Sequence, residues 1–152
     1  MSGYSASLTT TLATSANWCM AEIRAAAGSR IRLFEIGITS RTAGTVSFAV
    51  GRTVTPGIRP DFATITRPVP DNPNDPNSTI WIAKDWDVAG GGAVPEQPSV
   101  YLKRGGIQNT IMAGVVWIWQ DGLHIPPGKS IGVWNLTGLA SSTYELYFAL
   151  DE

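Results

Sequence analysis

The sequence predicts an all-β protein, an antiparallel β-sandwich of about eight strands with two long loops and an extended N-terminal arm. Three observations lead to this prediction. Short runs of β-branched and aromatic residues recur along the chain, with turn-forming residues between them. The 152 residues include 16 Gly and 10 Pro, which suits many turns, and only 15% of them are charged. Strands at this spacing are typical of a sandwich or a barrel.

The length of the chain suits a single domain over residues 1–152, large enough to bury a core without metals or disulfides. A net charge of −1 argues against a nucleic-acid partner, because binding to phosphates needs a surplus of Lys and Arg. Cys19 is the only cysteine, which excludes an intrachain disulfide and fits a reducing cytoplasm. We expect neither a signal peptide nor a membrane span, since the longest apolar run, Ile111 to Trp119, has the length of a strand.

The first 40 residues leave two alternatives open. Residues 1–17 are rich in Ser and Thr and suit either an edge strand or an extended arm. Trp18 to Ala27 has helix-favouring residues and a possible helix end at Gly28, yet a short strand fits almost as well. We favour the strand, because the β-rich run Ile31 to Ile38 makes a hairpin the simplest connection.

The strand pattern is clearer in the rest of the chain. In Thr45 to Arg52 the residues Val46, Phe48 and Val50 share one face. The almost uniformly apolar run Ile111 to Gln120 predicts a strand covered on both faces. The remaining predicted strands are a short one at Ile80 and Ile82, another at Ser99 to Lys103, and a final pair formed by Ile131 to Leu136 and Thr143 to Leu150. In the last of these, Thr143, Glu145, Tyr147 and Ala149 share one face.

Two long loops interrupt the strands. The Pro-rich loop at 53–78 contains six prolines and a run of Asn, Asp and Pro residues. The Gly-rich loop at 87–98 contains three consecutive glycines. Loops longer than about 15 residues are unusual in compact domains and are often functional or disordered.

A catalytic or metal site is not expected. His124 is the only histidine and lies beside a Pro-Pro turn, so a histidine-based metal site would need ligands from several chains or carboxylates from elsewhere. A catalytic triad would have to use His124, and nothing around it resembles a nucleophile elbow. The glycines of the Gly-rich loop lack the Lys and Ser or Thr of a phosphate-binding loop. The sequence therefore predicts a protein that is not an enzyme and needs no cofactor.

The acidic residues give only weak indications of chemistry. Asp85 and Asp87 flank Trp86, a cluster that a sugar-cleaving site can use, but a polar strand end that enters a loop is the better explanation. Asp71 and Asp75 offer oxygen ligands for calcium, but their Asn-Pro and Asp-Pro steps already account for them as turn formers. We therefore assign no metal site.

Six tryptophans are more than the interior of a small sandwich readily holds. Trp117 and Trp119 share a face of one predicted strand, and Trp134 lies on the next. Trp81 and Trp86 lie near the Gly-rich loop. Aromatic residues of this kind fill cores, anchor interfaces or bind sugars. We expect at least one or two of them at an intersubunit or ligand-facing surface.

Part of the sequence resembles the small jelly-roll capsid decoration (auxiliary) proteins of tailed bacteriophages. In the C-terminal half, an apolar strand leads into a Gly-Leu-x-Ile/Val-Pro-x-Gly corner and then a Gly-containing strand. The segments that carry this likeness are Val115–Trp119, Asp121–Gly128, Ile131–Trp134 and the end Leu150–Glu152. In the N-terminal half they are Ala21–Ala25, Gly28 and Ile31–Ile38, which look like the first hairpin of the same group.

The resemblance implies a jelly-roll-like sandwich and a structural role without catalytic residues. Such a protein is a homotrimer that binds the major capsid protein on the outer capsid surface of the virion, after synthesis in the host cytoplasm. The residues expected at the trimer interface are Trp117, Trp119 and Trp134. Those expected to contact the capsid, from the arm and the Pro-rich loop, are Tyr4, Leu8, Leu12, Pro70, Pro73 and Pro76.

One alternative keeps the same fold but changes the role. A carbohydrate- or receptor-binding module of a phage fibre or tail uses exposed aromatic side chains to hold its ligand. Its expected residues are Trp81, Trp86 and Asp85. A third reading, a small glycan-active enzyme, lacks the histidines and paired carboxylates that it needs.

Overall fold

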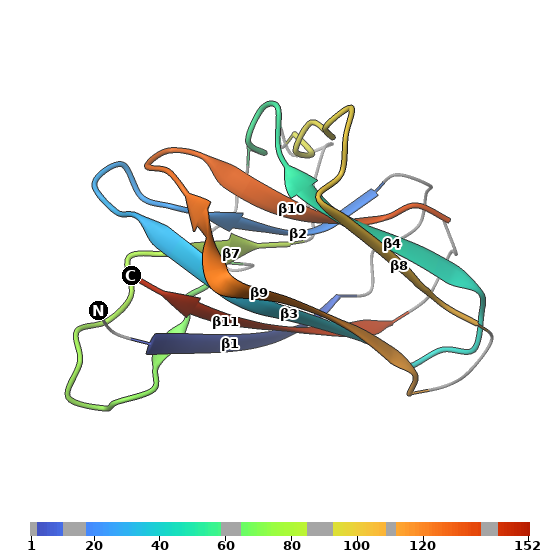
Figure 1. The fold of residues 1–152 in the computed structure, drawn as a ribbon, viewed down its shortest axis with the longest axis horizontal. Helices are drawn as coiled ribbons and strands as arrows, with labels where there is room; N and C mark the ends of the chain where they lie inside the picture. Colours follow the sequence, from blue (N-terminus) through green and yellow to red (C-terminus); the bar gives the residue numbers. More distant parts are fainter. Residues whose placement is uncertain (1–2, 11–17, 59–64, 85–92, 109–111, 138–142) are drawn as a thin grey trace.

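The structure of the chain, a computed structural model, describes residues 3–10, 18–58, 65–84, 93–108, 112–137 and 143–152. These residues form eleven β-strands, and none of them is helical. The strands make two antiparallel sheets that pack face to face (Figure 1). The predicted all-β sandwich is confirmed.

Eight long strands form the body of the sandwich. They are β1 (Gly3–Thr10), β2 (Trp18–Arg24), β3 (Ile31–Ser40), β4 (Val46–Arg52), β8 (Lys103–Ile107), β9 (Gly114–Ile125), β10 (Ser130–Asn135) and β11 (Tyr144–Asp151). One sheet holds them in the order β1-β11-β3-β9, and the other in the order β2-β10-β4-β8. The first four of these strands along the chain alternate between the two sheets, and so do the last four. This order is the jelly roll.

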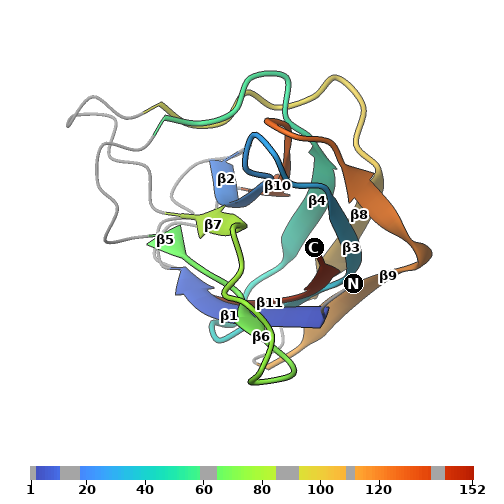
Figure 2. The ribbon, with the colours of Figure 1, turned by 90° about the vertical axis from the view of Figure 1, so that its left-hand side faces the viewer.

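Three short strands extend these sheets on one side. They are β5 (Ile65–Thr66), β6 (Val69–Pro70) and β7 (Trp81–Ala83). β6 joins the five-stranded sheet next to β1, whereas β7 and then β5 join the six-stranded sheet next to β2. Because β5 and β6 are close in the chain, this segment connects the edges of the two sheets (Figure 2). Part of the predicted Pro-rich loop is therefore a structured link.

Two predicted hairpins are wrong, although their strands are present. β2 lies in the six-stranded sheet and β3 in the five-stranded sheet, so they do not pair. The same holds for β10 and β11. A jelly roll passes the chain from one sheet to the other, so neighbours in sequence face each other across the core instead of sharing hydrogen bonds.

The core lies between the sheets and takes side chains from all eight long strands. Phe48 of β4 and Tyr144 of β11 meet across it edge to face, with ring centroids 5.3 Å apart and an interplanar angle of 87°. The face of β4 predicted to be apolar, formed by Val46, Phe48 and Val50, is buried here. Other large, fully buried side chains are Met20, Ile23, Ile31, Leu33, Ile36, Ile38, Ile80, Ile82 and Phe148.

The N-terminal segment that the structure describes is a strand within the sheet. β1 pairs with β11 along its whole length, beginning with Gly3 opposite Asp151. Its other edge meets β6 only at Tyr4 and Ser5. The start of β1 and the end of β11 consequently lie side by side (Figure 1). Residues 11–17, the rest of the predicted arm, lie outside the described residues.

β9 is the edge strand of the five-stranded sheet, and the prediction that Ile111 to Gln120 is covered on both faces is wrong. Within the described residues, β9 pairs only with β3. Trp117 points inward, but Val116 and Ile118 on the other face are 53% and 61% exposed. Apolar composition alone does not show whether a strand is central or lies at an edge.

β8 is the edge strand of the other sheet and lies beside β9. The strand predicted at Ser99 to Lys103 is wrong, because β8 begins only at Lys103. A Cβ atom on Gly105 of β8 would lie 2.9 Å from a methyl group of Val115. The absence of a side chain at Gly105 therefore lets β9 side chains close this side of the sandwich.

The described parts of the two long loops pair with each other and cover the outer face of the six-stranded sheet (Figure 2). Backbone hydrogen bonds join Ile58 to Ala93 in both directions, at 2.8 Å each. Two more join Glu96 to the backbone of 54–55. Beneath this cover, Trp134 is fully buried, and its ring lies 5.7 Å from that of Tyr101, centroid to centroid.

A buried ion pair fastens this cover to the sheet. The Glu22 carboxylate, 1% exposed, accepts hydrogen bonds from Nη2 of Arg24 at 3.0 Å and from the backbone N–H of Gly57. The same guanidinium donates to the carbonyl of Gly57 at 2.5 Å. The Glu22 charge is therefore satisfied from both the sheet and the loop, as a buried carboxylate requires.

Candidate functional site

No described segment covers the outer face of the five-stranded sheet, in contrast to the covered face of the other sheet. The strand register places Ser7, Tyr147, Gly37 and Val116 in one row across it. A Cβ atom on Gly37 would overlap the Tyr147 ring, so the ring occupies the space above this glycine. Tyr147 remains 40% exposed. It is an aromatic side chain supported from below by backbone and open to solvent above.

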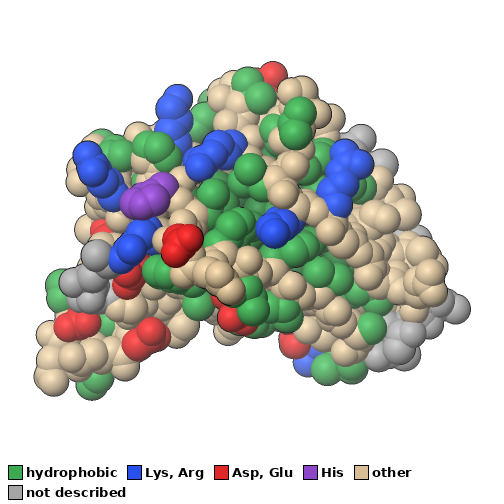
Figure 3. Space-filling view, viewed as in Figure 1, with side chains coloured by type: hydrophobic (Ala, Val, Ile, Leu, Met, Phe, Trp, Pro, Cys, Tyr) green, Lys and Arg blue, Asp and Glu red, His purple; other side chains and the backbone are tan. Residues whose placement is uncertain are grey.

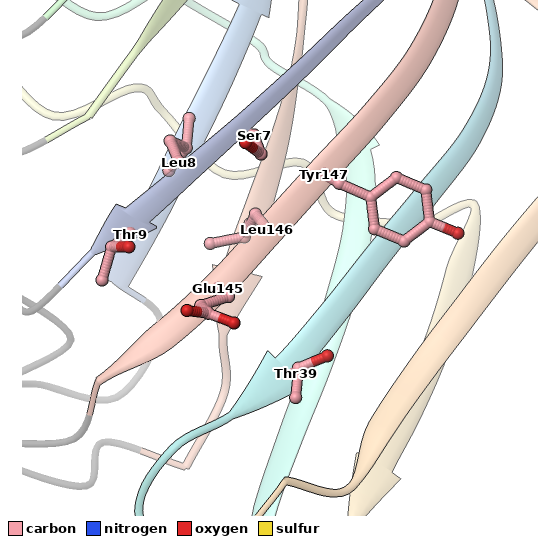
Figure 4. A pocket seen from close by; sticks show the side chains of 7 residues that line it. All are labelled: Ser7, Leu8, Thr9, Thr39, Glu145, Leu146 and Tyr147. Atoms are coloured by element: carbon pink, nitrogen blue, oxygen red, sulfur yellow. The ribbon is translucent and has the colours of Figure 1, made fainter.

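A shallow cavity of about 410 Å³ lies on one side of this ring. Its lining side chains come from β1, β3 and β11, as Figure 4 shows. Hydroxyl groups of Ser7, Thr9 and Thr39 and the carboxylate of Glu145 surround it together with Tyr147. The backbones of β3 and β11 are paired on both sides in the sheet, and β1 is paired with β11, so side chains supply most of the polar groups that a ligand meets.

A second cavity, of about 350 Å³, continues along the same face. It shares Ser7 and Tyr147 with the first, and Ser5, Thr66 and Arg67 add polar groups to its lining. The two cavities form one groove along β1 and β11, which we call the Tyr147 groove.

The charge in the Tyr147 groove is largely balanced. Oε1 of Glu145 lies 3.0 Å from Nε of Arg41, and both side chains are well exposed. At the other end, Arg67 donates a hydrogen bond of 3.4 Å to the carbonyl of Ser78. The groove therefore has no strong net charge. It is polar around Glu145 and partly apolar in the second cavity, where Val69 is 65% exposed.

The β9 end of the same sheet is apolar. Val116 and Ile118 project from its outer face. Figure 3 shows hydrophobic side chains gathered along the side of the molecule where β8 and β9 lie, with Lys and Arg side chains scattered around them. The open sheet face thus has a hydroxyl-rich half and an apolar half.

The tryptophans predicted at a trimer interface are mostly core residues. Trp134 is fully buried under the loop cover, and Trp117 is 7% exposed and packs between the sheets. Trp119 is half-buried and packs against the core. The expectation that Trp117 and Trp134 form a subunit surface is thus wrong. The exposed positions on β9 are their neighbours Val116 and Ile118.

The predicted capsid contacts divide into two groups. Tyr4 and Leu8 are buried, so the expectation that they reach a partner is wrong; Leu12 lies outside the described residues. Pro70 is half-buried, whereas Pro73 and Pro76 are exposed in the turn after β6. The Tyr4 hydroxyl donates a hydrogen bond of 3.0 Å to the carbonyl of Pro76, which anchors this turn to the sheet.

Of the residues predicted for glycan binding or considered for catalysis, the structure describes Trp81 and His124. Trp81 is half-buried, and the Arg24 guanidinium lies 4.8 Å from its ring centroid. Asp85 and Trp86 lie outside the described residues. His124 lines a cavity of about 220 Å³ with Arg30, and none of its described lining residues carries a carboxylate or hydroxyl group. Among the described residues, no cluster of His, Cys, Asp and Glu suits a metal ion.

Sequence reasoning missed the Tyr147 groove. The alternation of the last strand had placed Glu145 and Tyr147 on one face, which was the available signal. The hydroxyl-rich pattern of the first strand was the second signal. Neither pattern indicated that β1, β3 and β11 would be neighbours, because their pairings join distant parts of the chain.

The fold and this face define a jelly-roll β-sandwich with one covered and one open sheet surface. Comparison of the sequence with protein-family models and with curated proteins finds no match. No helix in the described part of the chain is long and apolar enough to span a membrane.

Proposed function

We propose that the chain is a structural virion protein that decorates and stabilises a bacteriophage capsid as a homotrimer, and that it is not an enzyme. It binds the outer surface of the major capsid protein lattice. The sequence resemblance to capsid decoration proteins supports this proposal, and the jelly-roll order is compatible with it. The observation that carries it is the edge strand β9 with Val116 and Ile118 exposed.

Self-association through β9 follows from its position and side chains. An edge strand presents backbone N–H and C=O groups to a partner, and exposed apolar residues add a hydrophobic gain when they are covered. Because Val116 and Ile118 are 53% and 61% exposed, burial of their remaining surface is worth about 1–2 kcal/mol for each side chain. A neighbouring copy that covers β9 would therefore both pair its free backbone groups and bury its exposed apolar side chains.

The turn after β6 supplies a contact element that reaches the capsid lattice. It projects beyond the end of β1 in Figure 1 and carries the exposed Pro73 and Pro76. Its shape is held internally, since the backbone N–H groups of Asn74 and Asp75 donate to the side chain and carbonyl of Asn72, at 3.1 and 3.0 Å. A preformed turn loses little conformational entropy on binding.

The test combines mass measurement and capsid binding. Sedimentation equilibrium of the wild type should give a trimer, and the protein should co-sediment saturably with undecorated phage heads. Val116→Lys and Ile118→Lys should shift the mass towards the monomer. Ser47→Lys, at an exposed site on β4 of the other sheet, is the control and should remain trimeric. A monomeric wild type that does not bind heads would refute the proposal.

A further inference from the structure

The Tyr147 groove has no role in the proposed self-association, yet its composition is that of a binding site. We propose that it binds a neutral oligosaccharide. Three features carry this inference: the supported ring of Tyr147, the hydroxyl groups around it and the balanced charge. The proposal is independent of trimer formation, which depends on the β9 end of the face.

The Tyr147 ring is arranged as a stacking platform. It projects from β11 across β3, as Figure 4 shows, and lies above Gly37, where any larger residue would displace it. Its inner side therefore rests on the sheet, and 40% of the residue is accessible to a ligand. The apolar C–H face of a sugar ring packs on an aromatic face in this way, by dispersion and weak C–H contacts.

The hydroxyl groups match the needs of a sugar rather than those of an apolar ligand. Ser7, Thr9 and Thr39 each offer a donor and an acceptor, and a carbohydrate hydroxyl needs both. Glu145 adds a carboxylate acceptor beside them. An apolar partner placed here would strip water from these groups without replacing their hydrogen bonds, which costs free energy.

The charge pattern favours a neutral ligand. Arg41 already pairs with Glu145, so the first cavity has neither an unpaired cation for an anionic sugar nor a strong excess of negative charge. Arg67, in the second cavity, is a single cation at the far end. An acidic polysaccharide or a nucleic acid would need a row of basic residues along its backbone.

The groove is longer than one sugar ring. Its lining residues on β1 run from Ser5 to Thr9, and four residues of a strand span roughly 13 Å. Ser7 and Tyr147 lie where the two cavities meet. A short chain of sugars can therefore stack on Tyr147 at its centre and contact hydroxyl groups in both directions.

The experiment is isothermal titration calorimetry of the full chain with maltohexaose, chitohexaose and cellohexaose, and with hexagalacturonate as the charged comparison. At least one neutral hexaose should bind, and more tightly than hexagalacturonate. Tyr147→Ala should weaken that binding by about tenfold, and Thr39→Val by about threefold. Tyr147→Phe, which keeps the ring, should stay close to the wild type. Thermal unfolding and sedimentation confirm that each variant keeps its fold and mass.

Three results would overturn the proposal. The first is that no neutral hexaose binds at millimolar concentration. The second is that Tyr147→Ala binds as well as the wild type, or that binding is lost in Ile118→Lys instead, which places the ligand on the apolar half. The third is a preference for hexagalacturonate. None of these results depends on whether the wild type is a trimer or binds phage heads.

Discussion

Tyr147 occupies the space above Gly37, so the side chain of one strand takes the place of a side chain on its neighbour. Gly37→Val should therefore destabilise the fold, although valine favours strands, because its methyl groups collide with the ring. We expect a loss of about 1–3 kcal/mol in the free energy of unfolding, measured by urea titration. Gly28→Ala is the control, since a Cβ there meets no atom within 4 Å. Equal stability of both variants would contradict this packing.

Trp134 stands over Gly132 in a similar way, but under the loop cover. Trp134→Ala should lower the free energy of unfolding by about 3–5 kcal/mol, because it leaves a large cavity. Trp134→Phe should cost less. The buried indole Nε1 has no hydrogen-bond partner among the described residues, so phenylalanine removes an unsatisfied N–H as well as volume. Urea titration gives the free energy of unfolding of both variants. A larger loss in Trp134→Phe than in Trp134→Ala would contradict this account.

The Glu22–Arg24 pair should matter far more than the exposed Arg41–Glu145 pair. Glu22→Ala removes the acceptor of Arg24 and of the Gly57 N–H, and should cost on the order of 2–4 kcal/mol. Arg41→Ala breaks a pair that is 54% and 40% exposed, and should cost less than about 1 kcal/mol. Hydrogen exchange at Gly57 and Ile58 should accelerate only in Glu22→Ala. Equal acceleration in both variants would show that the pair does not hold the cover.

Cys19 should report on the opening of the cover. It is fully buried, and burial, together with the nearby Glu22 carboxylate, raises the pKa of its thiol well above the ordinary value. A thiol reagent at pH 8 should therefore label it only when the cover opens or the protein unfolds. Labelling in native buffer should be slow in the wild type and faster in Glu22→Ala. Fast labelling of the wild type would contradict the closed cover.

Glu152 should make stability depend on acid pH. Burial opposes its ionisation, but hydrogen bonds from the backbone N–H and hydroxyl of Thr79 and from the hydroxyl groups of Ser29 and Ser78 outweigh it and lower its pKa. A lowered folded-state pKa stabilises the fold above the unfolded-state pKa, and this contribution is lost as the pH falls through the folded-state pKa. Solvent screening limits it to less than about 1 kcal/mol.

The comparison of wild type with Glu152→Gln isolates this contribution. Urea titrations should show the wild type to be more stable at pH 7, with the difference shrinking as the pH falls below the ordinary pKa of a glutamate. If the difference in the free energy of unfolding between wild type and Glu152→Gln stays constant over this pH range, the carboxylate charge contributes nothing to stability.

The alternation of apolar residues predicts strands in this chain, but not their partners. Thr45 to Arg52 shows the reason. Its inward-facing residues occur at every second position, and this alternation fits a strand at any position in a sheet. β2 and β3 are adjacent in sequence and were therefore predicted to pair, whereas the jelly roll places them in opposite sheets. The pairing depends on contacts between distant segments, for which a single sequence holds no local signal.

Burial of the aromatic side chains was equally hard to infer. Trp134 projects from the outer face of its sheet, where alternation predicts exposure, and it is buried because 93–102 folds back over it. Tyr147 also projects outward and remains open, because no described segment covers it. A loop therefore decides that Trp134 is buried and Tyr147 is exposed. The Gly- and Pro-rich loop sequences show no alternation from which this could be predicted.

The pairing of Gly3 with Asp151 has a practical consequence for engineering. A peptide fused before β1 and one fused after β11 would emerge from the same corner of the sandwich. A short linker there would also allow a circular permutation with new ends in an exposed turn, such as the one containing Asn74. The opposite end of both sheets would stay free, so fused cargo would leave each subunit from one defined corner.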